Sequence, residues 1–199
     1  MVLKKLFYML ISVTLFSCSA PARAVVVTLT DDMIAEAEAF GQTHSEDAGV
    51  LLSRQYSTGK ADLFEDRIIV RTKWHKLALA SAHKARKGAV CDASERKELL
   101  ADAALQIDVI LFGNRIDFAN DFVVTLEQDG RTIKPLKQHA DHFQVQRHKR
   151  ESLSGFPSCR ATLRAYFAYG SFAPDQPSSM HIQKLHSTHQ VILDLKKFR

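Results

Sequence analysis

Two groups of histidines are the side chains of this sequence whose type and spacing could carry chemistry. His139 and His142 form the first group, and His181, His186 and His189 form the second. Imidazole binds zinc and copper and exchanges protons near neutral pH, so either group could serve a metal site or an acid–base reaction. However, residues three apart on a strand point to opposite faces, and no HExxH motif is present. We therefore expect solvated surface histidines, with the histidine-based site kept as the alternative.

No other motif in the sequence predicts catalysis or cofactor binding. A nucleophilic serine would call for a GxSxG turn, and nucleotide binding for a P-loop or a GxGxxG loop, and the sequence contains none of these. The carboxylates Asp117, Asp121 and Glu127 lie near expected turns, where such groups are typically solvated or cap backbone amides. The sequence therefore assigns no catalytic residue, no metal ligand and no cofactor, and it favours a protein that is not an enzyme.

The first 24 residues have the composition of a secretory signal. Two lysines precede an apolar run from Leu6 to Phe16, and small residues follow. The run is too short to span a bilayer as a helix. Ala22-Arg23-Ala24 fits the rule for ordinary signal cleavage, which would leave Val25 as the first residue of a periplasmic or secreted protein.

A second form of processing is compatible with the same segment. Leu15-Phe16-Ser17-Cys18 resembles the lipobox of bacterial lipoproteins, although Phe16 departs from the small or aliphatic residue usual there. The resemblance implies that Cys18 would carry a lipid and tether the protein to a membrane. The protein would then be an outer-membrane lipoprotein that faces the periplasm or the cell surface.

Cys91 and Cys159 remain in the chain after either form of processing. Disulfides form in oxidising compartments, so an even pair of cysteines in an exported protein predicts a Cys91–Cys159 bond. In the chain-entropy model such a bond would stabilise the fold by roughly 4 kcal/mol. It would join the two halves of the mature chain.

The charge of the chain gives little support for a nucleic-acid partner. Its formal net charge is +5, but Lys4, Lys5 and Arg23 belong to the signal segment, which contains no acid. Without that segment the basic residues exceed the acidic ones by about two, so we expect no nucleic-acid binding. Hydrophobic residues make up 46% of the chain, which predicts a folded domain.

The hydrophobic pattern predicts an α+β fold that changes character near residue 105. Residues 25–104 are expected to be mainly helical: Thr30 and two aspartates mark a helix start, and apolar residues from Trp74 to Ala85 follow helical spacing up to Gly88. The exception is Arg67–Thr72, whose β-branched residues predict a short strand.

Residues 105–199 are expected to form an antiparallel β-sandwich. Asp129-Gly130 predicts a tight hairpin turn, and residues 161–169 alternate as a long strand. Residues 180–185 and 190–195 predict a closing pair of strands. We therefore expect N-terminal helices packed on a C-terminal β-sandwich, for which an immunoglobulin-like architecture is one arrangement.

Together these inferences favour an exported cell-envelope protein that acts as a non-enzymatic binding or assembly module. Its partner would be another envelope protein, contacted through sheet edges or loops as in β-augmentation. The alternative is an exported enzyme or metal-handling protein built on the His139/His142 and His181/His186/His189 groups. Convergence of these histidines in space would discriminate between the two functions.

Overall fold

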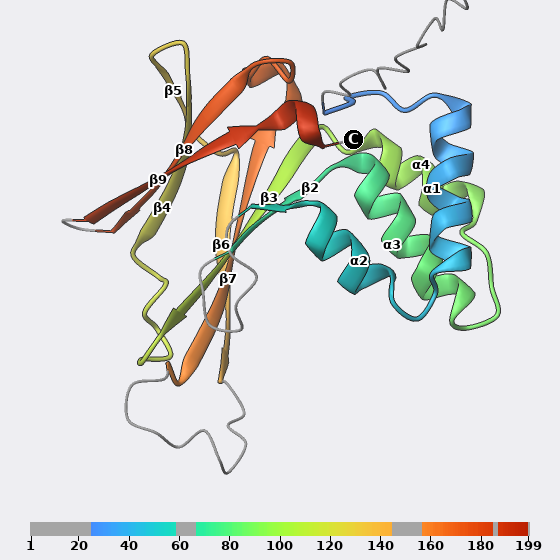
Figure 1. Cartoon of the computed structure of the whole chain (residues 1–199), viewed down its shortest axis with the longest axis horizontal. Helices are drawn as coiled ribbons and strands as arrows, with labels where there is room; N and C mark the ends of the chain where they lie inside the picture. The colour runs from blue at the N-terminus through green and yellow to red at the C-terminus, as the bar shows by residue number, and fades with distance from the viewer. Residues whose placement is uncertain (1–24, 59–66, 145–156, 185–186, 199) are drawn as a thin grey trace, which may run out of the picture.

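The computed structural model describes residues 25–58, 67–144, 157–184 and 187–198 of the 199-residue chain. Within these residues the protein is a mixed α+β fold with four α-helices and two antiparallel sheets (Figure 1). The expected signal segment with Cys18 lies outside the described residues, and so does His186. None of the described helices is long and apolar enough to cross a membrane.

Three of the helices begin at a residue whose side chain caps the first turn. The hydroxyls of Thr30 and Thr72 and the carboxylate of Asp92 each accept a hydrogen bond from the backbone amide three residues later. The expected helix start at Thr30 is therefore confirmed. The helices are α1 (Asp31–Thr43), α2 (Ala48–Gln55), α3 (Lys73–Ala85) and α4 (Ala93–Ala101).

The first sheet has five strands in the order β1-β2-β3-β7-β6. It combines strands from both halves of the chain, because β1 and β2 come before residue 104, β1 pairs with β2, and β2 pairs with β3. The helices are thus interspersed with strands, and a separate helical layer at the N-terminus is not confirmed. The strands are β1 (Ser57–Thr58), β2 (Arg67–Arg71), β3 (Ala104–Gly113), β6 (Lys137–Gln144) and β7 (Cys159–Ala168).

The second sheet has four strands in the order β5-β4-β8-β9. Asp129 and Gly130 have φ angles of 52° and 72° and form the turn between β4 and β5, as expected for a primed hairpin. The expected pairing of the two C-terminal strands is confirmed, since β8 pairs with β9 along its length. The strands are β4 (Phe122–Gln128), β5 (Arg131–Ile133), β8 (Pro177–Lys184) and β9 (Ser187–Asp194).

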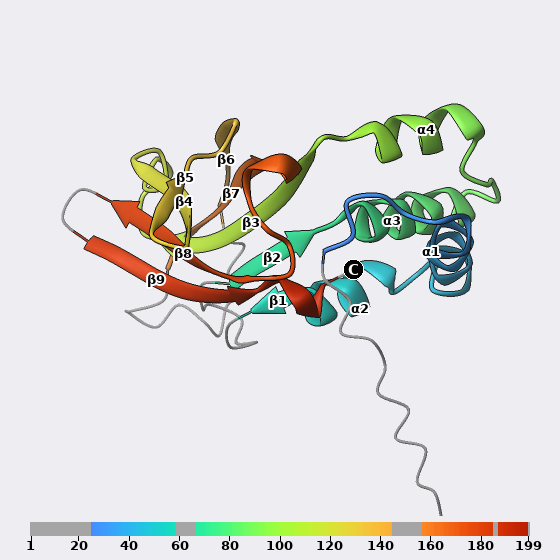
Figure 2. The ribbon, with the colours of Figure 1, turned by 90° about the horizontal axis from the view of Figure 1, so that it is seen from above.

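One hydrophobic core joins both sheets to the helices. Val124 and Met180 from the four-stranded sheet belong to the same buried cluster as Leu163 and Phe167 from the five-stranded sheet. Figure 2 shows the helices beyond one end of the strands, with α3 leaving directly from the end of β2. This arrangement leaves one face of the five-stranded sheet free of helices along most of its length.

The side-chain amide of Gln138 in β6 connects the two sheets. It donates to the carbonyl oxygen of Phe122 at 2.6 Å and accepts from the amide of Val124 at 2.9 Å. Both backbone groups belong to the part of β4 that lies before its pairing with β5. The glutamine therefore satisfies a strand edge that would otherwise expose its hydrogen-bonding groups.

The expected Cys91–Cys159 disulfide is not formed in the structure. Both cysteines are free and buried. Cys159 begins β7 and pairs with Gly113 at the end of β3, whereas Cys91 lies between α3 and α4, before β3 begins. The ten residues of β3 span roughly 34 Å, so the start of β7 and the connection between α3 and α4 lie at opposite ends of the molecule (Figure 2). Burial is the largest cause that raises the pKa of the Cys91 thiol.

Candidate functional site

The two faces of the five-stranded sheet have opposite chemistry. Strand pairing is continuous from β2 through β3 and β7 to β6, so alternate residues of each strand share a face. One face is apolar and buried, as Ile107 and Leu163 illustrate. The opposite face, which we call the charged face, comprises Arg67, Ile69, Arg71, Gln106, Asp108, Ile110, Phe112, Lys137, His139, Asp141, Phe143, Arg160, Thr162, Arg164 and Tyr166. Its central residues Ile69, Ile110 and Thr162 are buried. It carries five cationic and two acidic side chains.

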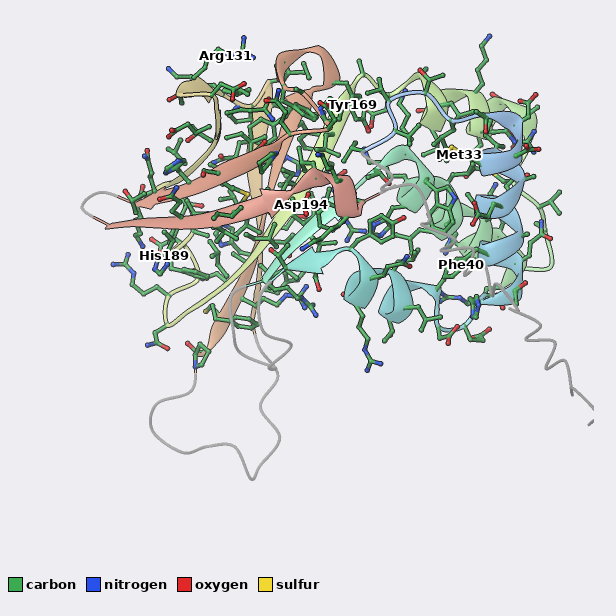
Figure 3. All side chains as sticks on the ribbon, turned by 45° about the horizontal axis from the view of Figure 1, so that its top comes forward. Met33, Phe40, Arg131, Tyr169, His189 and Asp194 are labelled. Carbon is green, nitrogen blue, oxygen red and sulfur yellow. The ribbon has the colours of Figure 1, made fainter. Side chains whose placement is uncertain are left out.

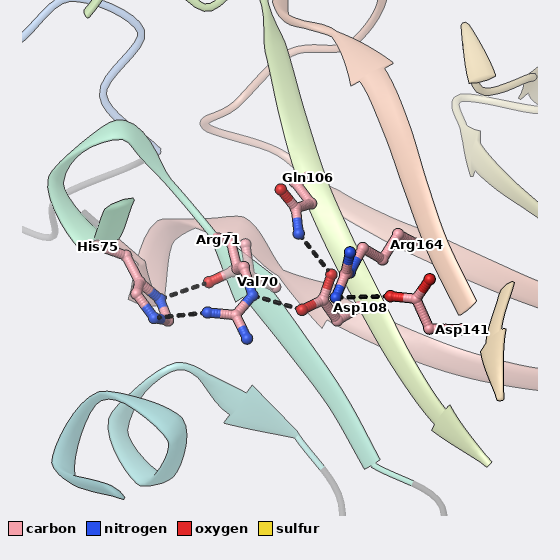
Figure 4. Close-up of polar contacts among 7 residues, drawn as sticks. All are labelled: Val70, Arg71, His75, Gln106, Asp108, Asp141 and Arg164. Atoms are coloured by element: carbon pink, nitrogen blue, oxygen red, sulfur yellow. Dashed lines mark hydrogen bonds and ion pairs between the residues drawn. The ribbon is translucent and has the colours of Figure 1, made fainter. Parts of the chain in front are cut away.

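Asp108 lies at the centre of the charged face and is almost fully buried. It accepts hydrogen bonds from the Nε atom of Arg71 and, at 2.7 Å, from the Nε2 atom of Gln106 (Figure 4). Asp108 is 1% exposed. A carboxylate removed from water in this way is stable only when charged or polar groups replace its hydration. Arg71 and Gln106 supply that replacement.

His75 of α3 holds the other side of the Arg71 guanidinium. Its Nδ1 atom lies 3.2 Å from the carbonyl oxygen of Val70, and its Nε2 atom lies 3.3 Å from Arg71 (Figure 4). Burial, followed by the charge of Arg71, lowers the pKa of His75 to about 3. The ring is therefore neutral at pH 7, and its partners assign the proton to Nδ1, with Nε2 accepting from Arg71.

The β6 side of the charged face contains a second ion pair and an aromatic stack. Arg164 lies 2.7 Å from the carboxylate of Asp141. The His139 ring stacks on the Tyr166 ring with centroids 5.9 Å apart, and the Lys137 ammonium lies 4.4 Å from the centre of the same tyrosine ring. The tyrosine thus holds a cation by its π-face.

Arg67 and Arg160 are the two arginines of this face that lie outside its two ion pairs. Among the described residues, neither guanidinium has a carboxylate partner. Burial, followed by the nearby charge of Arg67, lowers the pKa of Arg160 from its usual value. The Arg160 guanidinium also lies 5.9 Å from the ring centre of Phe143, which is 51% exposed.

A cavity of about 370 Å³ continues the charged face towards the helices. Its lining includes Lys137 and Tyr166 from that face, together with Asp102 and Leu136. The Asp102 carboxylate is already bonded to the Lys76 ammonium at 2.5 Å. The cavity is therefore lined by the Lys137 ammonium on the Tyr166 ring, by an apolar side chain and by a carboxylate that is already paired.

The structure does not bring the expected histidine groups together. His139 stacks on the charged face, whereas His142 points to the other face of β6 and its Nε2 atom lies 2.8 Å from the Oδ1 atom of Asn120. His181 of β8 lies 3.1 Å from Glu127. His189 is exposed on β9, away from the helices (Figure 3). In the described part of the chain, no three His, Cys, Asp or Glu side chains gather around a point that could hold a metal ion.

Our reading of the sequence did not identify the residues of the charged face as a site. A signal for it exists in the alternation of β7, where Arg160, Thr162, Arg164 and Tyr166 occupy every second position. Asp108 is a second signal, since it stands alone within an apolar strand. Neither pattern predicts which arginines have partners, because that depends on strands far apart in the sequence.

Comparisons with known proteins give no name to this arrangement. No protein-family model, no curated protein and no solved structure matches the chain. The protein is therefore described by its own fold and site, as a mixed α+β protein with a charged sheet face.

Proposed function

We propose that this chain is an exported, non-enzymatic binding module of the cell envelope that holds another envelope protein on its charged face. The observation that carries the proposal is the pair Arg67 and Arg160, which have no carboxylate partner among the described residues on a face where Arg71 and Arg164 each have one. An acidic surface on the partner would supply the missing charges. Export is proposed from the signal segment, with a periplasmic or secreted location, or a membrane tether through Cys18.

The breadth and composition of the charged face support a protein partner. Arginine and aromatic side chains are enriched in the contact regions of protein interfaces. Arg160 and Tyr166 are of these types, and Phe143 and Leu136 add exposed apolar surface at its margin. An excess of positive charge over four strands would steer an acidic partner into this orientation.

We also propose that the two sheets pack as a β-sandwich with the charged face outside. The shared hydrophobic core and the bridge from Gln138 to β4 support this arrangement. In a sandwich, the apolar faces point inward and the remaining faces meet solvent or a partner. The charged face would then be the surface that is presented to the envelope.

The test is capture of the partner from solubilised envelope with the tagged full chain. The test variant carries Arg67→Glu, Lys137→Glu and Arg160→Glu. The control variant carries Lys87→Glu and Lys97→Glu, which reverse two exposed charges at the helical end. We expect the test variant to lose a protein that wild type and control both retain, and we expect higher salt to weaken the capture. Equal capture by all three chains would reject the proposal.

One contact favours the alternative, an exported enzyme or metal-handling protein. The Nε2 atom of His181 lies 3.1 Å from a carboxylate oxygen of Glu127, and a carboxylate commonly orients a histidine that binds metal or transfers protons. Titration of the wild type and of His181→Gln with zinc and with copper tests this alternative. Metal binding that disappears in the variant would support it.

A further inference from the structure

We infer that Arg67 and Arg160 form the contact that receives two neighbouring carboxylates from one acidic protein segment. The inference rests on the proposed function and names the chemistry that the partner presents at this face. It concerns a specific pair of side chains, so it can fail while the wider role of the charged face stands.

The register of the strands places the two arginines on either side of β3. Arg67 of β2 is opposite Ile110, which in turn is opposite Thr162 of β7. Arg160 lies two residues before Thr162 on the same face of β7. The α-carbons of the two arginines are thus about two strand spacings apart across the sheet and one two-residue step apart along it, roughly 10 Å and 7 Å. Two long arginine side chains can both reach a ligand above β3 from these positions.

The chain itself shows which anion satisfies an arginine on this face. Arg71 is paired with Asp108, and Arg164 is paired with Asp141, so each guanidinium takes one carboxylate. The planar guanidinium matches the two oxygens of a carboxylate. By the same pairing, Arg67 and Arg160 call for two carboxylates from outside the described chain.

An extended segment with acids at positions i and i+2 has the required shape. Its two acidic side chains would point to the same side and lie roughly 7 Å apart at their α-carbons. Thr162 lies between the arginine positions but is only 6% exposed, so the two guanidiniums make the contact. The exposed ring of Phe143 beside Arg160 provides an apolar contact next to the charges.

Two acids should bind far better than one because the arginines are close enough to repel each other. A single carboxylate neutralises one cation and leaves its neighbour unpaired. A second carboxylate removes the remaining repulsion, so the two contacts reinforce each other. The predicted ligand is therefore a segment with paired acids, and a segment with one acid should bind weakly.

The experiment measures the binding of fluorescent peptides to the full mature chain. The probe is Ser-Glu-Thr-Glu-Ser, and the comparison peptides replace one or both glutamates by glutamine. The protein variants are Arg67→Gln with Arg160→Gln, and the control Lys87→Gln with Lys97→Gln. We expect roughly tenfold weaker binding for each arginine removed, since each loses a charge-assisted hydrogen bond, and no change in the control. Arg67→Lys with Arg160→Lys should recover part of the affinity, because it keeps charge without the planar fork.

Three results would overturn the inference. The first is equal binding of the two-acid and one-acid peptides to the wild type. The second is peptide binding that is unchanged in Arg67→Gln with Arg160→Gln. The third is no peptide binding, with arginine-dependent binding of inorganic phosphate or of phosphatidylglycerol vesicles instead, which would assign the pair to a phosphate or lipid ligand.

The proposed function fails by a different result. If the triple charge reversal loses the envelope partner while Arg67→Gln with Arg160→Gln retains it, the charged face binds the partner through other residues. In that case the proposed function stands and the inference is wrong. If the triple charge reversal retains the partner while the peptide results hold, the proposed function is wrong and the diacid contact stands.

Discussion

The two sheets of this protein turn faces of different chemistry away from the apolar core. On the four-stranded sheet, the register aligns mostly uncharged residues, and its two acids are paired locally: Glu127 lies 3.1 Å from His181, and Asp194 lies 3.8 Å from Lys197. We call this surface the neutral face; it comprises Val123, Thr125, Glu127, Thr132, Pro177, Ser179, His181, Gln183, Thr188, Gln190, Ile192 and Asp194. On the charged face of the five-stranded sheet, cations outnumber acids, and Arg67 and Arg160 have no carboxylate in the described chain.

This difference between the two faces locates residues that lower the stability of the folded protein. The neutral face satisfies its polar groups locally and leaves Ile192 72% exposed, which is an ordinary solvent-facing sheet. The charged face buries Asp108 and keeps two arginines within range of each other, and both features oppose folding. A binding role explains why such a face would be retained.

The largest expected effect compares the buried acid Asp108 of the charged face with the half-exposed acid Glu127 of the neutral face. Asp108→Asn removes the charge opposite Arg71 and leaves that partly buried guanidinium without its carboxylate, so we expect a loss of about 3 kcal/mol in the free energy of unfolding. Glu127→Gln removes a half-exposed partner of His181 and should cost less than about 1 kcal/mol. Urea unfolding at pH 7 measures both values. Similar losses in the two variants would contradict the contrast between the faces.

A second variant separates loss of charge from loss of packing at Asp108. Replacing both partners, with Arg71→Met and Asp108→Leu, leaves no unpaired charge and should recover much of the stability lost in Asp108→Asn. The same double variant should keep Arg67 and Arg160 in place, since they lie on other positions of the sheet. Failure to recover would mean that the ion pair is needed for the fold itself.

Acidic pH should lower the free energy of unfolding through protonation of His75 in the unfolded chain. Its pKa is about 3 in the folded chain and near 6.5 when unfolded, so the unfolded chain alone takes up a proton between these values. Stability is therefore lost as the pH falls below 6.5, by about 2 kcal/mol at pH 5. In urea unfolding at pH 7 and pH 5, His75→Gln should lose about 2 kcal/mol less than wild type. His83→Gln, an exposed control on α3, should behave as wild type. An unchanged pH response of His75→Gln would show that this ring is not the acid-sensitive group.

The sequence predicts the local parts of this fold and misses the parts that depend on distant segments. The helix start at Thr30, the turn at Asp129 and Gly130, and the β8–β9 pair follow from short-range patterns and are confirmed. The union of β2 with β3 and β7 is not visible in any local pattern, because pairing between segments tens of residues apart leaves no periodic signal. This is why a separate helical half was expected.

The candidate site shows the same limit. Alternation assigns Asp108 to the face opposite Ile107 and Val109, and the structure agrees. Its burial could not be predicted, since it depends on Arg71, which is 37 residues away. The number of histidines suggested a possible metal or acid–base site, yet the described histidines lie on both sheets.

A smaller effect concerns Gln138, whose side chain connects the two sheets. Gln138→Leu removes two hydrogen bonds to the backbone of β4, and we expect a loss of about 1–2 kcal/mol in unfolding free energy. Gln190→Leu on the neutral face removes one exposed bond to Ser179 and should cost less than about 0.5 kcal/mol. Hydrogen exchange of the Val124 amide gives a local measurement. Unchanged protection of that amide in Gln138→Leu would mean that the glutamine does not hold this edge.

The smallest expected effect has the opposite sign and bears most directly on the charged face. Arg160→Gln removes a cation that is repelled by Arg67 and has no carboxylate partner in the part of the chain that the structure describes, so the folded chain should gain roughly 0.5 kcal/mol. For a chain of this size that is a rise of about 1–2 °C in the midpoint of thermal unfolding. Arg164→Gln, four residues later on the same face of β7, should lower the midpoint instead, because it leaves Asp141 without its partner. If both variants lower the midpoint, Arg160 contributes to the fold. If Arg160→Gln alone raises it while losing peptide binding, the arginine has been kept at the expense of stability, as expected for a residue whose role is recognition.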